Sequence, residues 1–271
     1  MNLSTQAQSL PTLFIPHGGG PCFFMEWDPP DTWRKMTAWL AELPAAIGVT
    51  PRALVVISGH WEAEKISITG SSHPPLLYDY SGFPPDTYKL QYPAPGSPAL
   101  ARQIVDLLAA AGFSAQIDPA RGFDHGVFIP LKVAFPEACI PIVQLSLQAG
   151  LDAQTHIEIG RALQSLRSQG VLIVGSGMSY HNLRGFADRF GPAAEEFDSW
   201  LTGAVCSPDA QTRNTRLAQW QMAPFARTAH PREDHLLPLM VAAGAAGNDL
   251  GSRIFTDQVM GARVSAYRFG R

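Results

Sequence analysis

Short, predominantly apolar runs are the feature that most constrains the fold of this chain. They read PTLFIP (11–16), ALVVIS (53–58), IPIVQLSL (140–147) and VLIV (171–174). Predominantly apolar runs of this length are typical of strands buried on both faces of a sheet. The amphipathic helix expected over Asp152–Gln169 ends at Gly170 and leads directly into the last of these strands. Strands that alternate with helices in this way favour an α/β fold.

Other segments add helices and strands to this pattern. They are a helix over Thr32–Leu43 with Asp31 as its N-cap, an edge strand over Lys65–Thr69, a helix from Ser97-Pro98 to Gly112, a helix over His235–Ala246 and a last strand over Val264–Phe269. No repeat or linker interrupts the 271 residues. We therefore expect one catalytic domain, residues 1–271, with a largely parallel or mixed central sheet and helices on both faces.

Composition excludes several classes of partner. The formal net charge is −3 and no cluster of Lys and Arg exists, so neither nucleic acid nor an anionic membrane surface is an expected partner. No apolar run approaches the ~18 residues of a membrane helix. The N-terminus lacks the order of a signal peptide, and the three cysteines are scattered without a C-x-x-C pair. We expect a cytoplasmic protein with reduced thiols.

A chain of this length buries enough apolar surface to fold without a structural metal. Any metal it binds is therefore expected to be catalytic. The segment Ser71–Pro95 is rich in Pro and Tyr and has neither helical nor strand periodicity. Long loops of this kind are uncommon unless they are functional, so the segment is a candidate lid.

The placement of the histidines points to a site. His17, His60 and His181 each follow an expected buried strand across a turn of small residues. In open α/β sheets, ligands gather beyond the carboxyl ends of the strands, so these imidazoles should meet there. His125 lies in a further turn, Gly122-Phe123-Asp124-His125-Gly126, and His235 at the start of a helix.

A single histidine at a strand end is more often a structural residue than a ligand, but recurrence at several ends argues for a site. His73, beside two prolines in the loop, and His156, on the expected solvated face of a helix, are better explained as structural or surface residues. His230 has two open interpretations, support behind the site or capping of the following helix.

A serine hydrolase is disfavoured. His17-Gly18-Gly19-Gly20 matches the oxyanion-hole motif of lipases, but no serine has the glycines of the G-x-S-x-G elbow that those enzymes also need. The H-E-x-x-H motif of zinc proteases is absent as well.

With these residues in view, the chain resembles the class III extradiol ring-cleavage dioxygenases, the LigB-type enzymes, and in particular the DOPA extradiol dioxygenases. The matching stretches run in order along nearly the whole chain. They are Pro16-His17-Gly18, Ser58-Gly59-His60-Trp61, Tyr92-Pro93-Ala94-Pro95-Gly96, Gly122-Phe123-Asp124-His125-Gly126, His181-Asn182-Leu183 and Asp234-His235-Leu236-Leu237-Pro238-Leu239.

The resemblance implies roles for five histidines. His17, His60 and His235 correspond to the metal ligands. His181 corresponds to the active-site base or, in metal-bound forms without substrate, to a fourth ligand, and His125 to a second acid/base or substrate-orienting residue. The chain departs from the family in reading His-Gly-Gly-Gly-Pro at its first turn instead of His-Gly-Ser-Pro. It also has a histidine where many extradiol enzymes have a carboxylate ligand.

The implied activity is the opening of a small catechol, DOPA-like or related, by O₂ at a mononuclear non-haem metal. Fe(II) suits this redox chemistry, whereas three imidazoles also suit Zn(II), which could be the ion bound on purification. A zinc-dependent hydrolase on the same scaffold is thus the main alternative, and a non-catalytic metal-binding protein is a weaker one. Oligomeric state stays open. Trp61 and His230 are candidate substrate-binding residues, and Tyr78, Tyr80 and Phe83 offer further aromatic faces.

Overall fold

The computed structural model describes residues 9–184 and 191–271, and in them the chain forms a mixed eight-stranded sheet of order β4-β3-β5-β2-β6-β1-β8-β7. The strands are β1 (Thr12–Pro16), β2 (Ala53–Ala63), β3 (Ile66–Thr69), β4 (Ala115–Asp118), β5 (Ile142–Gln148), β6 (Val171–Gly177), β7 (Gly251–Val259) and β8 (Ala262–Phe269). The helices are α1 (Arg34–Ile47), α2 (Pro98–Ala110), α3 (His125–Ala134), α4 (Ala153–Leu163), α5 (Gly191–Val205), α6 (Ala210–Ala218), α7 (Ala226–Ala229) and α8 (Leu237–Ala245).

The centre of the sheet is parallel. β5, β2, β6 and β1 run in one direction, while β8 and β3 join this group antiparallel from either side. The central strands are buried on both faces, as their predominantly apolar runs require. The predicted α/β class with a mixed sheet is therefore confirmed.

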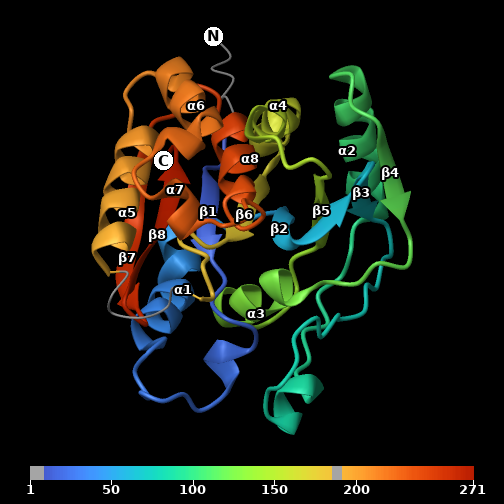
Figure 1. The fold of residues 1–271 in the computed structure, drawn as a ribbon. Helices are drawn as coiled ribbons and strands as arrows, with labels where there is room; N and C mark the ends of the chain where they lie inside the picture. The colour runs from blue at the N-terminus through green and yellow to red at the C-terminus, as the bar shows by residue number, and fades with distance from the viewer. Residues whose placement is uncertain (1–8, 185–190) are drawn as a thin grey trace.

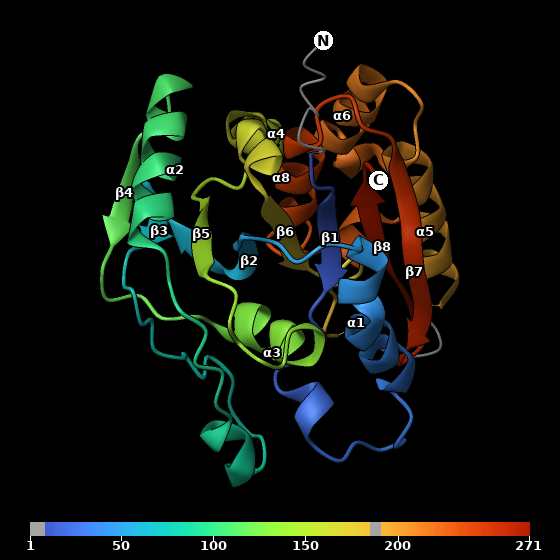
Figure 2. The ribbon, with the colours of Figure 1, turned by 180° about the vertical axis from the view of Figure 1, so that it is seen from behind.

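Helices cover both faces of the sheet. α4, α5 and α8 lie on the face nearer the viewer in Figure 1, and α1 lies on the face nearer the viewer in Figure 2. α8 packs on β6, β1 and β2 and against α4, while α1 packs against α3. The continuous sheet agrees with the single catalytic domain that we propose for residues 1–271. None of the helices in the described ranges is long and apolar enough to cross a membrane.

The edges of the sheet differ from the prediction. β3 is not an edge strand, because β4 pairs with it in parallel and takes the outer position. All four residues of β3 are buried, including its two polar residues. Hydrogen bonds allow this burial, since the N–H of Ser67 donates to Ser146 Oγ and that of Gln144 donates to Thr69 Oγ1. The polar residues of β3 therefore form a buried, hydrogen-bonded face and not a solvated one.

The first helix also differs from the prediction. It begins at Arg34 without a side-chain cap, so Asp31 is not its N-cap, and it continues past Pro44 to Ile47. The buried stripe of Met36, Leu40, Leu43 and Ile47 explains the extension. Gly48 then ends the helix in the left-handed region, with φ of 79°.

The remaining helix ends follow their expected signals. Ser97 Oγ accepts a hydrogen bond from the N–H of Leu100, and Asp152 Oδ1 accepts one from the N–H of Thr155. The helix from Asp152 changes into a 3₁₀ turn over Gln164–Gln169 and ends at Gly170. Between Ser71 and Pro95 the chain forms one 3₁₀ helix, Pro85–Lys89, and otherwise runs as a loop, as the composition indicated.

Candidate metal centre and active site

His17 and His60 reach the site from two central strands. β1 ends at Pro16, and the N–H of His17 still donates to Gly177 O at the end of β6. β2 does not stop at Ser58 as predicted but continues through His60 to Ala63. Its pairing with β5 is irregular between Ile57 and Glu62, so the predicted turn is instead a bulged part of the strand.

His235 comes from the segment before α8, which packs directly on the strand ends. A Cβ on Gly177 would lie 2.1 Å from His235 O, and one on Gly59 would lie 3.2 Å from the Cα of His235. The N–H of Met178 donates to His235 O at 3.0 Å and fixes the same segment. The glycines near the strand ends therefore allow this close approach.

The three ring nitrogens converge. His60 Nε2 lies 3.1 Å from His17 Nε2 and 3.1 Å from His235 Nε2. Nitrogens that each bind one ion at about 2.1 Å stand about 3 Å apart when they subtend a near-right angle, so this set fits a metal. In the described residues, two further groups of possible ligand atoms lie close together, and each contains an aspartate. One joins His60 and His125 to Asp79, and the other joins His181 and His235 to Asp234.

The hydrogen bonds of His17 set its tautomer. Ser176 Oγ donates to Gly126 O, so its remaining capacity is to accept, and it lies 3.1 Å from His17 Nδ1. Nδ1 of His17 therefore carries the proton, and Nε2 presents a lone pair to the centre. A partner behind a ligating imidazole commonly fixes it in this way.

Carboxylates lie behind the other two rings. Asp234 Oδ2 is 3.2 Å from His235 Nδ1, and Asp79 Oδ2 is 3.7 Å from His60 Nδ1. Nδ1 of His235 makes no hydrogen bond to a described residue, and the contact of His60 is longer than one. A carboxylate beside Nδ1 still attracts a proton there electrostatically, which leaves Nε2 for a metal. Sequence reasoning did not single out Asp79 or Asp234 as members of the site.

Burial keeps these rings neutral. It lowers the pKa of His17 and His235 well below the usual value, and the neighbouring histidines lower each pKa further. Burial also lowers the pKa of His60, with a further contribution from His125 and an opposing one from Asp79. Neutral imidazoles with converging lone pairs are what a divalent cation binds.

His125 stands beside the three rings, at the first residue of α3. Its ring centroid lies 3.9 Å from that of His60 and 5.5 Å from that of His17. Asp79 Oδ1 accepts from both the backbone N–H and Nδ1 of His125, at 2.9 and 2.8 Å. Burial alone would raise the pKa of Asp79, but the bonds from His125 lower it, so the carboxylate is ionised.

His181 lies beside the three converging rings, but its nitrogens are not among the Nε2 atoms that stand 3.1 Å apart. It follows β6, and its N–H donates to Ala229 O at 2.9 Å. Its ring stacks on that of His235, with centroids 3.4 Å apart and planes at 10°. Burial lowers the pKa of His181, which favours a neutral ring at neutral pH that can accept a proton.

A buried carboxylate supports the strand beneath His60. Asp124 accepts from Ser58 Oγ at 2.8 Å and from Gln144 Nε2, and it pairs with Arg121 at 3.4 Å. Burial raises the pKa of Asp124. Ser58 Oγ in turn accepts from the N–H of His60 at 3.2 Å, which connects Asp124 to the backbone of a candidate ligand.

The other candidate residues lie elsewhere. His230 is fully buried behind the site and donates from Nε2 to Ser179 O at 3.0 Å. Trp61 packs against Arg121 and does not line the cavity, and His73 is exposed in the loop. His156 was expected on a solvated face, and this was wrong. It is buried, donates from Nδ1 to Asp152 O and accepts from the N–H of Gln148.

A cavity of about 320 Å³ opens onto the histidines. Its lining comprises His17, Gly18, Gly19, Gly20, Trp27, Trp33, His60, Phe83, His125, Met178, His181, Leu183, His235 and Met260. Two positions of the glycine turn leave no room for side chains, since a Cβ on Gly18 would lie 2.3 Å from Cys22 Sγ and one on Gly20 would lie 2.8 Å from the Phe83 ring. Of the four aromatic candidates, Phe83 alone lines the cavity.

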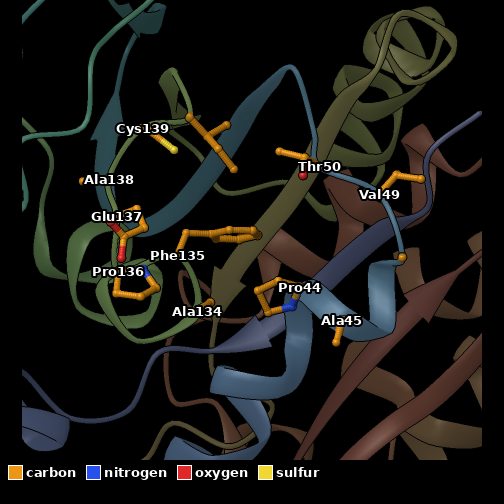
Figure 3. Close-up of a pocket in the computed structure, with 12 residues that line it drawn as sticks. Pro44, Ala45, Val49, Thr50, Ala134, Phe135, Pro136, Glu137, Ala138 and Cys139 are labelled. Carbon is orange, nitrogen blue, oxygen red and sulfur yellow. The ribbon is translucent and has the colours of Figure 1, made fainter.

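A larger cavity, of about 530 Å³, lies away from this chemistry. It is bordered by the end of α1 and by the segment between α3 and β5, where β2 and β5 begin. Figure 3 shows that its labelled side chains are mostly aliphatic or aromatic, with Glu137 and Cys139 at one side. It holds no cluster of histidines, so the smaller cavity is the candidate active site.

Comparison with known proteins gives a consistent result. Residues 11–269 match the family described as the catalytic LigB subunit of aromatic ring-opening dioxygenase. A 4,5-DOPA dioxygenase extradiol from Beta vulgaris is 38% identical over 95% of this chain and 96% of its own length. A dioxygenase from Hapsidospora irregularis is 36% identical over 98% and 87%. The solved structure of an uncharacterised protein from Escherichia coli K12 has a TM-score of 0.76 at 30% sequence identity. The match covers 96% of this chain and 100% of that one.

Proposed function

The chain belongs to the family of catalytic LigB subunits of aromatic ring-opening dioxygenases, and we propose that it opens the ring of a small catechol at the five-histidine centre. The family and the named relatives support an extradiol dioxygenase and not the zinc hydrolase considered from the sequence. We place the reaction in this cavity because three neutral imidazoles converge there and two more lie beside them.

We assign His17, His60 and His235 as the metal ligands. Their Nε2 atoms converge, and Ser176, Asp79 and Asp234 lie at their outer nitrogens. The metal that we propose for activity is Fe(II), with Zn(II) as an ion that the same nitrogens can hold on purification. When bound, ferrous iron would supply a path for electrons between a catechol and dioxygen, a redox role that zinc cannot fill.

We assign His181 as the proton-transfer residue. It lies at the cavity wall, is held by its backbone and by stacking on His235, and is not needed in the closest trio. A neutral imidazole there can take a proton from a catechol hydroxyl and return it later to the departing oxygen. His181 as a fourth ligand in the substrate-free enzyme is compatible with the same position.

His125 has a fixed tautomer that suits a second role at the substrate. Because Nδ1 is engaged by Asp79, Nε2 is the ring nitrogen left to form a hydrogen bond with a catechol hydroxyl. Tyr80 packs against His125, with centroids 5.7 Å apart, and against Phe83. The Tyr-containing loop thus supplies Asp79, Tyr80 and Phe83 around one side of the site, which supports a function in enclosing the substrate.

Oxygen uptake tests this proposal directly. The purified chain is stripped of metal, loaded anaerobically with ferrous iron and given a panel of catechols, DOPA among them. We expect one O₂ consumed per catechol and a yellow ring-opened semialdehyde, whereas cleavage between the hydroxyls gives a colourless diacid. The zinc-loaded protein serves as the control and should consume no oxygen. Ester hydrolysis by the zinc form, without oxygen uptake by the iron form, would instead favour the hydrolase.

A further inference from the structure

The wall of the active-site cavity is apolar apart from the histidines. Its side chains beyond the glycine turn are Trp27, Trp33, Phe83, Met178, Leu183 and Met260. Two of them stand at an exposed rim, since Leu183 is 76% exposed and Met260 is 37% exposed. Large apolar side chains left in water beside a functional cavity are typical of a surface that a ligand covers.

Charged side chains are absent from this wall among the residues that the structure describes. The nearest neighbouring groove shares Met260 and holds Lys35 and Arg34, but Lys35 pairs with Asp257 at 3.2 Å and Arg34 with Asp31 at 3.5 Å. Arg184 is exposed and does not line the cavity. A carboxylate brought into the cavity would therefore meet indole rings, a phenyl ring and thioethers.

The acidic residues near the centre are set back from the cavity, away from an ammonium group of the substrate. Asp79 is engaged by His125 and His60, and Oδ2 of Asp234 by His235 and Arg232, while Oδ1 of Asp234 is buried without a hydrogen-bond partner among the described residues. Neither lines the cavity. Moving a charge out of water without a partner is costly, so these walls accommodate neither the ammonium nor the carboxylate group of an amino acid.

We propose that the substrate is a catechol with a neutral, apolar substituent on its ring, such as an alkyl or aryl group, and not an amino acid or a carboxylic acid. This inference rests on the proposed function and selects among the catechols that it allows. The two hydroxyls face the histidines, and the substituent extends along Trp27, Phe83 and Leu183 toward Met260. A cavity of about 320 Å³ is at the small end for ligand sites, so the substituent is short.

Matched substrates test the charge. With the iron-loaded enzyme, kcat/KM is measured for 3-(3,4-dihydroxyphenyl)propionic acid, its methyl ester, L-DOPA, catechol and 4-propylcatechol. We expect the ester and 4-propylcatechol to exceed the acid and L-DOPA at least tenfold, with roughly a fourfold gain for each added methylene group. Anaerobic calorimetry with 4-propylcatechol and with the acid provides a second readout that does not depend on turnover, and it should give the same order.

A rim variant tests the location. Leu183→Arg places a cation at the mouth in an exposed position where folding is not at risk, and it should raise the ratio of acid to ester kcat/KM at least tenfold. Val49→Arg, at another exposed apolar residue outside the cavity, is the matched control and should leave the ratio unchanged.

The outcomes distinguish an error in the substrate class from an error in the proposed reaction. If the wild-type enzyme prefers L-DOPA or the acid, the substrate class is wrong while the dioxygenase stands. If Leu183→Arg leaves the ratio at the wild-type value, the proposed path of the substituent is wrong. Absence of oxygen uptake with every catechol would overturn the proposed function together with this inference.

Discussion

Asp79 and His125 are joined by two hydrogen bonds to a single carboxylate oxygen. Oδ1 of Asp79 accepts from the N–H of His125 at 2.9 Å and from its Nδ1 at 2.8 Å, and Oδ2 lies 3.7 Å from His60 Nδ1. One residue of the long loop thereby fixes the first turn of α3, the tautomer of His125 and one side of a candidate ligand. The loop therefore contributes a residue to the candidate site.

Asp79→Asn should lower kcat about 10- to 100-fold while the protein remains folded. An asparagine keeps the size of the side chain and an oxygen that can accept from His125, but it removes the negative charge. Its NH₂ group would then face Nδ1 of His60, a donor against a donor, where Asp79 Oδ2 now lies. Oxygen uptake measures kcat, and the iron content checks the neighbouring ligand. Asp86→Asn, which changes an exposed carboxylate paired with Lys89 in the same loop, is the control. Equal rates for the two variants would contradict the positioning role.

His60→Ala should abolish stoichiometric binding of a divalent metal. His60 is the ring whose Nε2 contacts both other nitrogens, so its removal takes away the central member of the trio. Calorimetric titration with zinc, which avoids oxidation, counts the sites. His73→Ala, at an exposed loop residue, should bind one equivalent as the wild type does. Tight binding of one equivalent by His60→Ala would show that the ligand assignment is wrong.

His181→Phe should retain the metal and lose turnover by about 10²–10⁴, the usual contribution of a general acid or base. Phenylalanine preserves the stacking on His235, where the ring planes differ by 10°, but it cannot carry a proton. Metal content and steady-state oxygen uptake are measured on the same preparation. If the metal is lost instead, His181 is a ligand, and proton transfer belongs to His125.

The central strands and their histidines could be predicted because their signals are local. Apolar runs reveal strands that are buried on both faces, and the carboxyl ends of parallel strands meet by topology. The sequence and the resemblance singled out His17, His125 and His235, and these side chains line one cavity, while their roles stay predictions.

The residues behind the ligands could not be predicted, because their roles depend on long-range contacts. Asp79 meets His125 across 46 residues, and Ser176 meets His17 across 159. An aspartate between two tyrosines in a loop carries no local signal except its place in an unusually long segment. The prediction that His156 is solvated failed for a related reason. Its ring is buried and accepts a hydrogen bond from the N–H of Gln148, a contact that helical spacing does not reveal. Cap and edge assignments failed where tertiary packing overrode local preference, as at Asp31 and β3.

Acid should destabilise the metal-free protein in part through His230. Burial lowers the pKa of this ring to about 3, while the unfolded chain titrates near the usual value of 6.5. Between those values the unfolded state binds a proton that the folded state does not, so the free energy of unfolding falls as the pH falls. His230→Gln removes this difference and keeps an amide donor for Ser179 O.

From about pH 7 to about pH 4.5 the wild type should therefore lose up to about 2.7 kcal/mol more than His230→Gln does, at about 1.4 kcal/mol per pH unit below 6.5. Urea unfolding of both metal-free proteins at the two pH values measures this double difference, from which the cost of the substitution itself cancels. The other buried histidines contribute equally to both proteins. A double difference of zero would mean that His230 is protonated in the folded state. Its role behind the site would then have to involve a charged ring.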